Sequence, residues 1–127
     1  MKKIIYSPGE PSGIGPDLII KLSSSNLWED LKIPIVSIGD PKLFIDRAAV
    51  LKKKIQIVEL ESPNEVSKNT RGLLQIIKVT KCSNTRPGKL YKSNAQYVLN
   101  NLTYSIEQTM QNEETALVTG PLSKENI

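Results

Sequence analysis

Residues 3–17, KIIYSPGEPSGIGPD, decide the fold of this chain. The stretch opens with a short apolar run that contains two β-branched isoleucines, which predicts a strand over 3–7. A loop rich in glycine and proline follows, and a helix is expected over 15–25. Pro16 suits the first helical turn, where its missing N–H is not needed, and Asp17 complements the helix dipole. The chain therefore begins with a strand, a tight loop and a helix.

The rest of the chain alternates between strands and helices. Further strands are predicted from short apolar or alternating runs at 34–38, 55–60, 73–79 and 116–119. A second helix is expected over 41–51, behind Asp40 as its cap. The long helix that ends at Asn112 should start at a capping box made by Ser93 and Gln96. Because the last strand is wholly apolar, we expect it to be buried on both faces. The alternation predicts an α/β fold: a mainly parallel sheet within three layers.

Two loops leave the carboxyl ends of predicted strands, where ligands bind in sheets of this kind. The loop over 7–16 holds three glycines and one carboxylate, and it leads into a helix N-terminus, which favours an anion. The loop over 119–124 turns at Gly-Pro and ends in a lysine that could reach a phosphate or carboxylate. The residues expected to line a cleft are Gly9, Glu10, Gly13, Gly15, Thr119, Gly120 and Lys124.

The residues alone leave a second interpretation open for each loop. The first loop could be a purely structural turn, since its Gly-x-x-x-Gly-x-Gly spacing is neither the dinucleotide fingerprint nor a Walker A loop. Lys124 could be an ordinary surface lysine on the first turn of a helix.

Composition excludes several classes of function. The 127 residues are 39% hydrophobic and 24% charged, as in an ordinary globular domain, and no apolar run approaches the length of a membrane span. The chain has no histidine, so it carries no Ser-His or Cys-His pair and no imidazole metal site. The net charge of +4 includes one dense run, Lys52 to Lys54, which does not indicate a nucleic-acid partner. One cysteine, Cys82, fits a reducing, cytoplasmic compartment.

Several segments match the motifs of one enzyme family in order along the chain. Residues 7–17, SPGEPSGIGPD, are similar to the signature TPGEPAGIGP(D/E), with departures only at Ser7 and Ser12. Residues 119–127, TGPLSKENI, are similar to the motif Thr-Gly-Pro-x-x-Lys-x-x-Ile. The helix from Arg47 and the segment from Gly88 into the long helix also look like that family. The chain thus resembles the 4-hydroxythreonine-4-phosphate dehydrogenases of vitamin B6 (pyridoxal 5'-phosphate) biosynthesis.

The resemblance implies a fold and a chemistry. Members of the family are two-domain homodimers with a fold like that of isopropylmalate and isocitrate dehydrogenases. They oxidise a phosphorylated hydroxy amino acid, 4-phosphohydroxy-L-threonine, with NAD. A divalent metal (Zn, Mg or Co) is held by three histidines from both subunits. None of these histidines occurs in this chain.

Residues 1–127 should therefore be the N-terminal α/β domain portion of such an enzyme, with the second, metal-binding domain absent. We expect the chain alone to be inactive and to bind neither NAD nor metal, and we assign it no catalytic residue and no metal ligand. A missing half should also leave an exposed apolar edge.

Two other functions stay open at this point. The chain could be a non-catalytic α/β module that binds a phosphorylated metabolite or a protein partner. It could also belong to another enzyme class on a similar layered fold, such as a phosphate acyltransferase.

Overall fold

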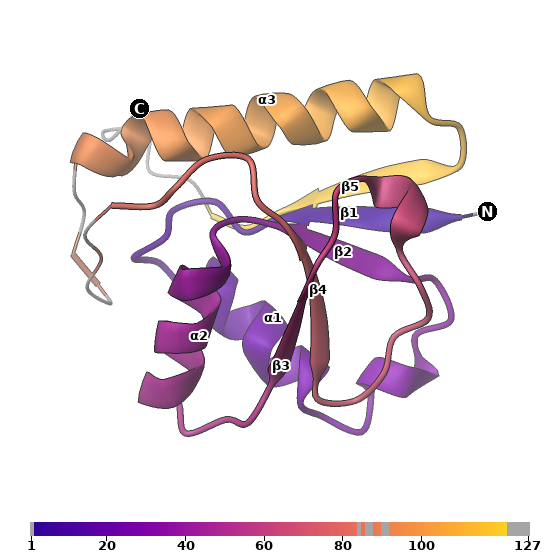
Figure 1. Ribbon diagram of the computed structural model, residues 1–127, viewed down its shortest axis with the longest axis horizontal. Coiled ribbons are helices and arrows are strands. Elements are labelled where there is room, and N and C mark those ends of the chain that lie inside the picture. The colour runs from indigo at the N-terminus through magenta and orange to yellow at the C-terminus, as the bar shows by residue number, and fades with distance from the viewer. Residues whose placement is uncertain (1, 84, 86–87, 90–91, 122–127) are drawn as a thin grey trace.

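The computed structural model describes residues 2–83, 85, 88, 89 and 92–121, and these form a layered α/β structure (Figure 1). The strands are β1 (Lys3–Ser7), β2 (Ile35–Ile38), β3 (Gln56–Glu59), β4 (Leu73–Ile77) and β5 (Thr115–Thr119). The helices are α1 (Gly15–Ser23), α2 (Pro41–Val50) and α3 (Ala95–Gln111). Each predicted element is present, and most ends differ from the prediction by one or two residues.

All five strands form one parallel sheet in the order β3-β4-β2-β1-β5. α1 and α2 cover one face of this sheet, and α3 lies across β1 and β5 on the other face (Figure 1). The three layers and the parallel sheet confirm the predicted fold class. Among the described residues, no helix has the length and apolar character needed to cross a bilayer.

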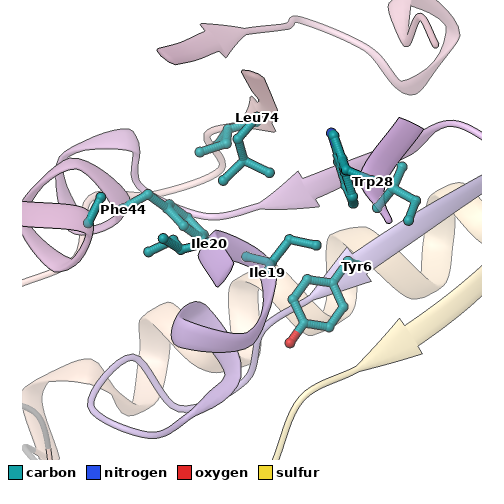
Figure 2. Packing of buried hydrophobic residues seen from close by; sticks show 9 residues of the cluster. Tyr6, Ile19, Ile20, Trp28, Phe44 and Leu74 are labelled. Atoms are coloured by element: carbon teal, nitrogen blue, oxygen red, sulfur yellow. The ribbon is translucent and has the colours of Figure 1, made fainter. Parts of the chain in front are cut away.

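The larger core lies between the sheet and the α1–α2 layer. Tyr6, Ile19, Ile20, Phe44 and Leu74 pack together there (Figure 2). Trp28 joins them, is almost fully buried, and its indole N–H donates to the Leu73 carbonyl at 3.2 Å. A second cluster under α3 contains Ile5, Val36, Ile38, Val66 and Ile77. Burial on both faces explains why β1 and β2 are rich in isoleucine and valine.

The prediction that the last strand is buried on both faces is wrong. β5 is the edge strand of the sheet, and Val118 is 46% exposed. An apolar groove of about 190 Å³ runs beside it, lined by Ile4, Tyr6, Leu18, Ile19, Leu22, Ile35 and Val118. The apolar side chains of a strand indicate that it can pack against other apolar groups. They do not indicate whether other elements cover both of its faces. The expected exposed apolar edge is thus found at β5.

The predicted capping box at the start of α3 is also wrong. The helix begins at Ala95 with Asn94 as its N-cap residue, and the Asn94 side chain makes no capping hydrogen bond to the helix. A 3₁₀ turn over Lys92–Asn94 takes the place where Ser93 would have capped. The Ser93 hydroxyl instead accepts a hydrogen bond from the Ser83 hydroxyl at 3.2 Å. Packing of Asn94 into the interior therefore overrides the local sequence signal.

Candidate functional site

The topology places the two candidate loops side by side. From β1 the chain crosses through α1 to β2 on one side, whereas α3 carries it to β5 on the opposite side of β1. The strand order thus reverses between β1 and β5, and their ends are in register, with Ser7 beside Thr119. Such a switch point at the carboxyl ends of parallel strands is the usual ligand site of an open α/β sheet.

Backbone hydrogen bonds join the two loops directly. The Gly120 N–H donates to the Ser7 carbonyl at 2.8 Å, and the Glu10 N–H donates to the Pro121 carbonyl at 3.0 Å. The loops over 7–16 and 119–121 therefore form one compact unit rather than two independent turns.

Three glycines make this packing possible. A Cβ atom would lie 1.8 Å from the Pro8 carbonyl oxygen at Gly15 and 2.0 Å from the same atom at Gly120. At Gly9, whose φ is +84°, it would lie 2.3 Å from the Pro121 carbonyl oxygen. Gly13 is less restricted, because its closest contact is the Glu10 carbonyl oxygen at 3.3 Å. The glycines thus make room for neighbouring backbone. This agrees with one part of the alternative in which the first loop is a purely structural turn.

The remaining candidate residues differ in their surroundings. The Glu10 side chain is buried, whereas Thr119 is exposed at the end of β5. Lys124 lies outside the described residues. The structure brings Glu10, Thr119 and the four glycines to the switch point, and their contact with a ligand stays a prediction.

A cavity of about 590 Å³ lies at the neighbouring carboxyl ends, beyond β2 and β4. Its walls are the start of α2 and the segment that follows β4, with the residues Asp40, Lys42, Leu43, Asp46, Lys81, Cys82, Ser83 and Thr85. Lys42 pairs with Asp46 at 2.8 Å on the exposed rim. The wall therefore carries charges of both signs.

Asp40 organises this cavity. One carboxylate oxygen caps α2 by accepting from the Lys42 N–H at 3.1 Å, as predicted for this residue. The other oxygen accepts from the Cys82 N–H at 2.9 Å. Asn94 holds the same segment from α3, since its side-chain oxygen accepts from the Ser83 N–H at 3.0 Å. The segment after β4 is thus tied to two helices.

The Cys82 thiol is free and buried. Burial raises its pKa to about 12, and the carboxylates of Asp40 and Glu10 add to this effect, while the Arg47 guanidinium opposes it. Burial is also the main reason why the pKa of Tyr97 is raised, and the Asp40 N–H, which donates to its hydroxyl at 3.0 Å, partly opposes this rise. The raised pKa favours the protonated thiol at neutral pH, whereas the thiolate is the nucleophilic form.

Sequence reasoning missed the second role of Asp40 and the position of Arg47. Asp40 was predicted only as a helix cap. It also follows the carboxyl end of a parallel strand, which is the position that marked the two loops as candidate ligand sites. Arg47 entered the sequence analysis only as part of a family-like helix, and nothing local indicated its burial, because a single arginine on a helix is usually exposed.

The donor set does not fit the metal that the family resemblance implies. The chain has no histidine, and the described residues contain no group of three or more cysteine, aspartate or glutamate side chains placed to hold a metal ion. The loop glycines do not fit a dinucleotide either, since protein backbone fills the space beside Gly9, Gly15 and Gly120.

Fold and site together define a doubly wound parallel α/β protein with a glycine-rich switch point. Residues 30–127 match the family model described as pyridoxal phosphate biosynthetic protein PdxA. The chain belongs to this family.

The curated relatives are named 4-hydroxythreonine-4-phosphate dehydrogenase. One from Yersinia pseudotuberculosis is 34% identical over 125 residues, which cover 98% of this chain and 37% of the relative. One from Shewanella frigidimarina is 37% identical over 123 residues, covering 97% of this chain and 36% of the relative. The chain thus spans little more than a third of the length of these relatives.

Solved structures agree with the fold. That of 4-hydroxythreonine-4-phosphate dehydrogenase from Klebsiella pneumoniae matches with a TM-score of 0.85 at 24% identity, over 99% of this chain and 39% of that chain. The corresponding structure from Burkholderia phymatum matches with a TM-score of 0.83 at 18% identity, over 99% and 38%.

Proposed function

We propose that this chain forms the N-terminal α/β part of a dehydrogenase that oxidises 4-phosphohydroxy-L-threonine with NAD and a divalent metal in vitamin B6 biosynthesis. The observation that carries the proposal is the match of residues 30–127 to the PdxA family model. The named relatives, which include this region within a longer chain, support the same activity. A homodimer in the cytoplasm, acting on this small phosphorylated substrate, is part of the proposal.

The chain contributes the rim of the switch point to this activity. Its two loops are held together by backbone hydrogen bonds, and a buried carboxylate, Glu10, lies within them. Because the donor set of this chain does not fit a metal ion, we derive no step through that metal here. We propose that the 127 residues alone are inactive.

Activity assays of two polypeptides test the proposal. The purified 127-residue chain and the product of the complete reading frame that contains it are assayed for NADH formation with 4-phosphohydroxy-L-threonine, NAD and a divalent metal. The Yersinia pseudotuberculosis relative serves as the positive control. We expect no turnover by the 127 residues. Turnover by them would contradict the predicted inactivity.

The coding sequence downstream of Ile127 gives a second, independent test. An in-frame continuation that encodes Gly-His-Thr would support the dehydrogenase. If a longer product contains this continuation but does not oxidise the substrate under conditions where the relative does, the proposed function is wrong. Binding of a phosphorylated metabolite without turnover would favour the non-catalytic alternative.

Lys124 stays a predicted substrate contact. In the longer product, Lys124→Ala should raise KM or lower the rate, because a compact positive charge near the substrate phosphate or carboxylate would be lost. Steady-state kinetics against the unaltered protein measure this, and unchanged values would remove Lys124 from the site.

A further inference from the structure

Arg47 lies on α2 but makes its contacts in the loop of the candidate site. Its side chain is only 3% exposed. The Nη2 atom donates to the Pro11 carbonyl at 2.5 Å, and the Nη1 atom donates to the Gly13 carbonyl at 3.1 Å. The same Nη1 atom lies 2.7 Å from a carboxylate oxygen of Asp17 in the first turn of α1. One guanidinium thus spans the loop and the helix that follows it.

We propose that Arg47 is a positioning residue, which sets the shape of the loop over 7–16 by holding the Pro11 and Gly13 carbonyls from α2. The inference rests on the proposed function in one respect, namely that this loop faces a ligand. Its geometric content concerns this chain alone and is tested on it.

The hydrogen bonds of the loop pass this constraint on to Glu10. The Gly13 N–H donates to the Glu10 carbonyl at 3.0 Å, so the carbonyl and the amide of Gly13 are both bound. The Glu10 N–H in turn donates to the Pro121 carbonyl at 3.0 Å. The backbone of Glu10 is therefore fastened on one side to the loop that Arg47 holds and on the other side to the end of β5.

Ser12 supports the view that the loop is held from outside. It lies between the two carbonyls that Arg47 binds, is 2% exposed, and its hydroxyl has no hydrogen-bond partner among the residues that the structure describes. A buried hydroxyl without a partner is unfavourable, so Ser12 does not itself select this conformation. We infer that the contacts of Arg47 stabilise this conformation of the loop.

Arginine suits this task better than lysine does. The planar guanidinium carries five N–H donors in a rigid arrangement, so it can bind two carbonyls and a carboxylate at once. A lysine ammonium is a compact charge and cannot reach the same acceptors together. Substitution by lysine should therefore keep the charge and lose the geometry.

Amide hydrogen exchange by NMR, measured on the 127-residue chain, tests the proposal. The reporters in the loop are the amides of Glu10 and Gly13. The amides of Gly39 and Leu60, which follow β2 and β3 and donate to Ile77 and Ile76, report on the sheet and serve as core reporters. In Arg47→Ala we expect exchange at the loop reporters to rise at least about tenfold more than at the core reporters. Arg47→Lys should give an intermediate increase.

Chemical rescue separates positioning from general stabilisation. Guanidinium at low millimolar concentration should restore slow exchange at Glu10 and Gly13 in Arg47→Ala, because it can fill the vacated donor site. Arg71→Ala is the control, since Arg71 is exposed and, within the described part of the chain, donates to the Ser24 carbonyl alone. Its loop exchange should match the unaltered chain and not respond to guanidinium.

Equal increases at loop and core reporters, or loop exchange that stays unchanged, would overturn the positioning role. If Arg47→Ala does not fold, the decision rests on Arg47→Lys, in which the same selective increase is required. None of these results depends on dehydrogenase activity, so a failure of this proposal is distinguishable from a failure of the proposed function.

Discussion

At the scale of single residues, the positions with the least space for a side chain are the glycines of the switch point. Gly15 and Gly120 face the same Pro8 carbonyl oxygen, and neither needs a positive φ. Glycine is needed at these two positions because another backbone segment lies close by. Backbone cannot rotate away as a side chain can. A methyl group there must move the loop itself.

Gly15→Ala should therefore destabilise the chain by roughly 1–3 kcal/mol, because overpacking outweighs the gain of about 1 kcal/mol from replacing glycine in a helix. The matched control is Gly13→Ala, where the closest contact of the new Cβ is 3.3 Å instead of 1.8 Å. Urea unfolding of the two variants measures the difference. Equal stability of both variants would show that the close approach at Gly15 is relieved without cost.

Cys82 should make stability depend on alkaline pH. Its pKa is about 12 in the folded chain against 9.0 as the ordinary value, so the folded state keeps the proton longer. This contribution is complete below pH 9, the lower bound set by the unfolded thiol, and is lost as pH rises towards the folded pKa. The loss amounts to about 1.4 kcal/mol per pH unit within that window.

Urea unfolding of the unaltered chain and of Cys82→Ala between pH 8 and about pH 10.5 measures this effect. The difference between the two stabilities should be constant up to the pKa of the unfolded thiol and then shrink as pH rises. Titration of Tyr97 differs between the two proteins, because Cys82 adds to the rise of its pKa, and Tyr97→Phe in both backgrounds removes this contribution. Parallel stability curves over the whole range would contradict the burial of the thiol.

At the scale of elements, the start of α3 shows packing prevailing over a local signal. Asn94 is fully buried and binds both the amide and the hydroxyl of Ser83, at 3.0 and 2.7 Å. Ser93 and Gln96 have the spacing of a capping box but do not form one. The helix is thus placed by what Asn94 contacts across the cavity wall.

Asn94→Ala should cost about 1–3 kcal/mol, because the part-buried amide and hydroxyl of Ser83 and the buried thiol of Cys82 lose their acceptor. Ser93→Ala should change stability by less than about 0.5 kcal/mol, since the hydrogen bond that the Ser83 hydroxyl donates to it is exposed. Thermal or urea unfolding of both variants checks the contrast. A larger loss at Ser93 than at Asn94 would restore the capping box as the determinant of this helix start.

At the scale of the whole molecule, β5 forms one edge of the parallel sheet, and the described residues place no further strand beside it. Exposed apolar side chains border that edge, with Leu18 at 52% and Val118 at 46% exposure. An open edge beside an apolar groove favours association, because both strand hydrogen bonds and buried area become available to another chain.

The 127-residue chain should therefore self-associate reversibly as its concentration rises, and Val118→Lys should reduce this association. Met110→Lys is the control, because Met110 is 82% exposed on α3, away from the groove. Sedimentation velocity over a concentration series measures the effect. Association that is unchanged in Val118→Lys would place the contact elsewhere.

Most of the fold was predictable because its signals are local. Apolar runs, the Gly-Pro loops and Asp40 as a cap each depend on a few neighbouring residues, and they predicted all five strands and three helices. The proximity of the loops over 7–16 and 119–121 was predictable too, since the carboxyl ends of parallel strands lie at the same edge of the sheet. The burial of β5 and the cap of α3 were not predictable, because both depend on segments distant in the chain.

By itself, the sequence determined the alternation of elements, the lack of histidine ligands and the two glycine-rich loops. Only the tertiary structure decided that β5 is an edge, that Asp40 joins α2 to the segment after β4, and that Arg47 reaches across to the first loop. The physical reason is range: periodicity and turn chemistry act over a few residues, whereas strand order and buried hydrogen bonds join residues about thirty to forty positions apart.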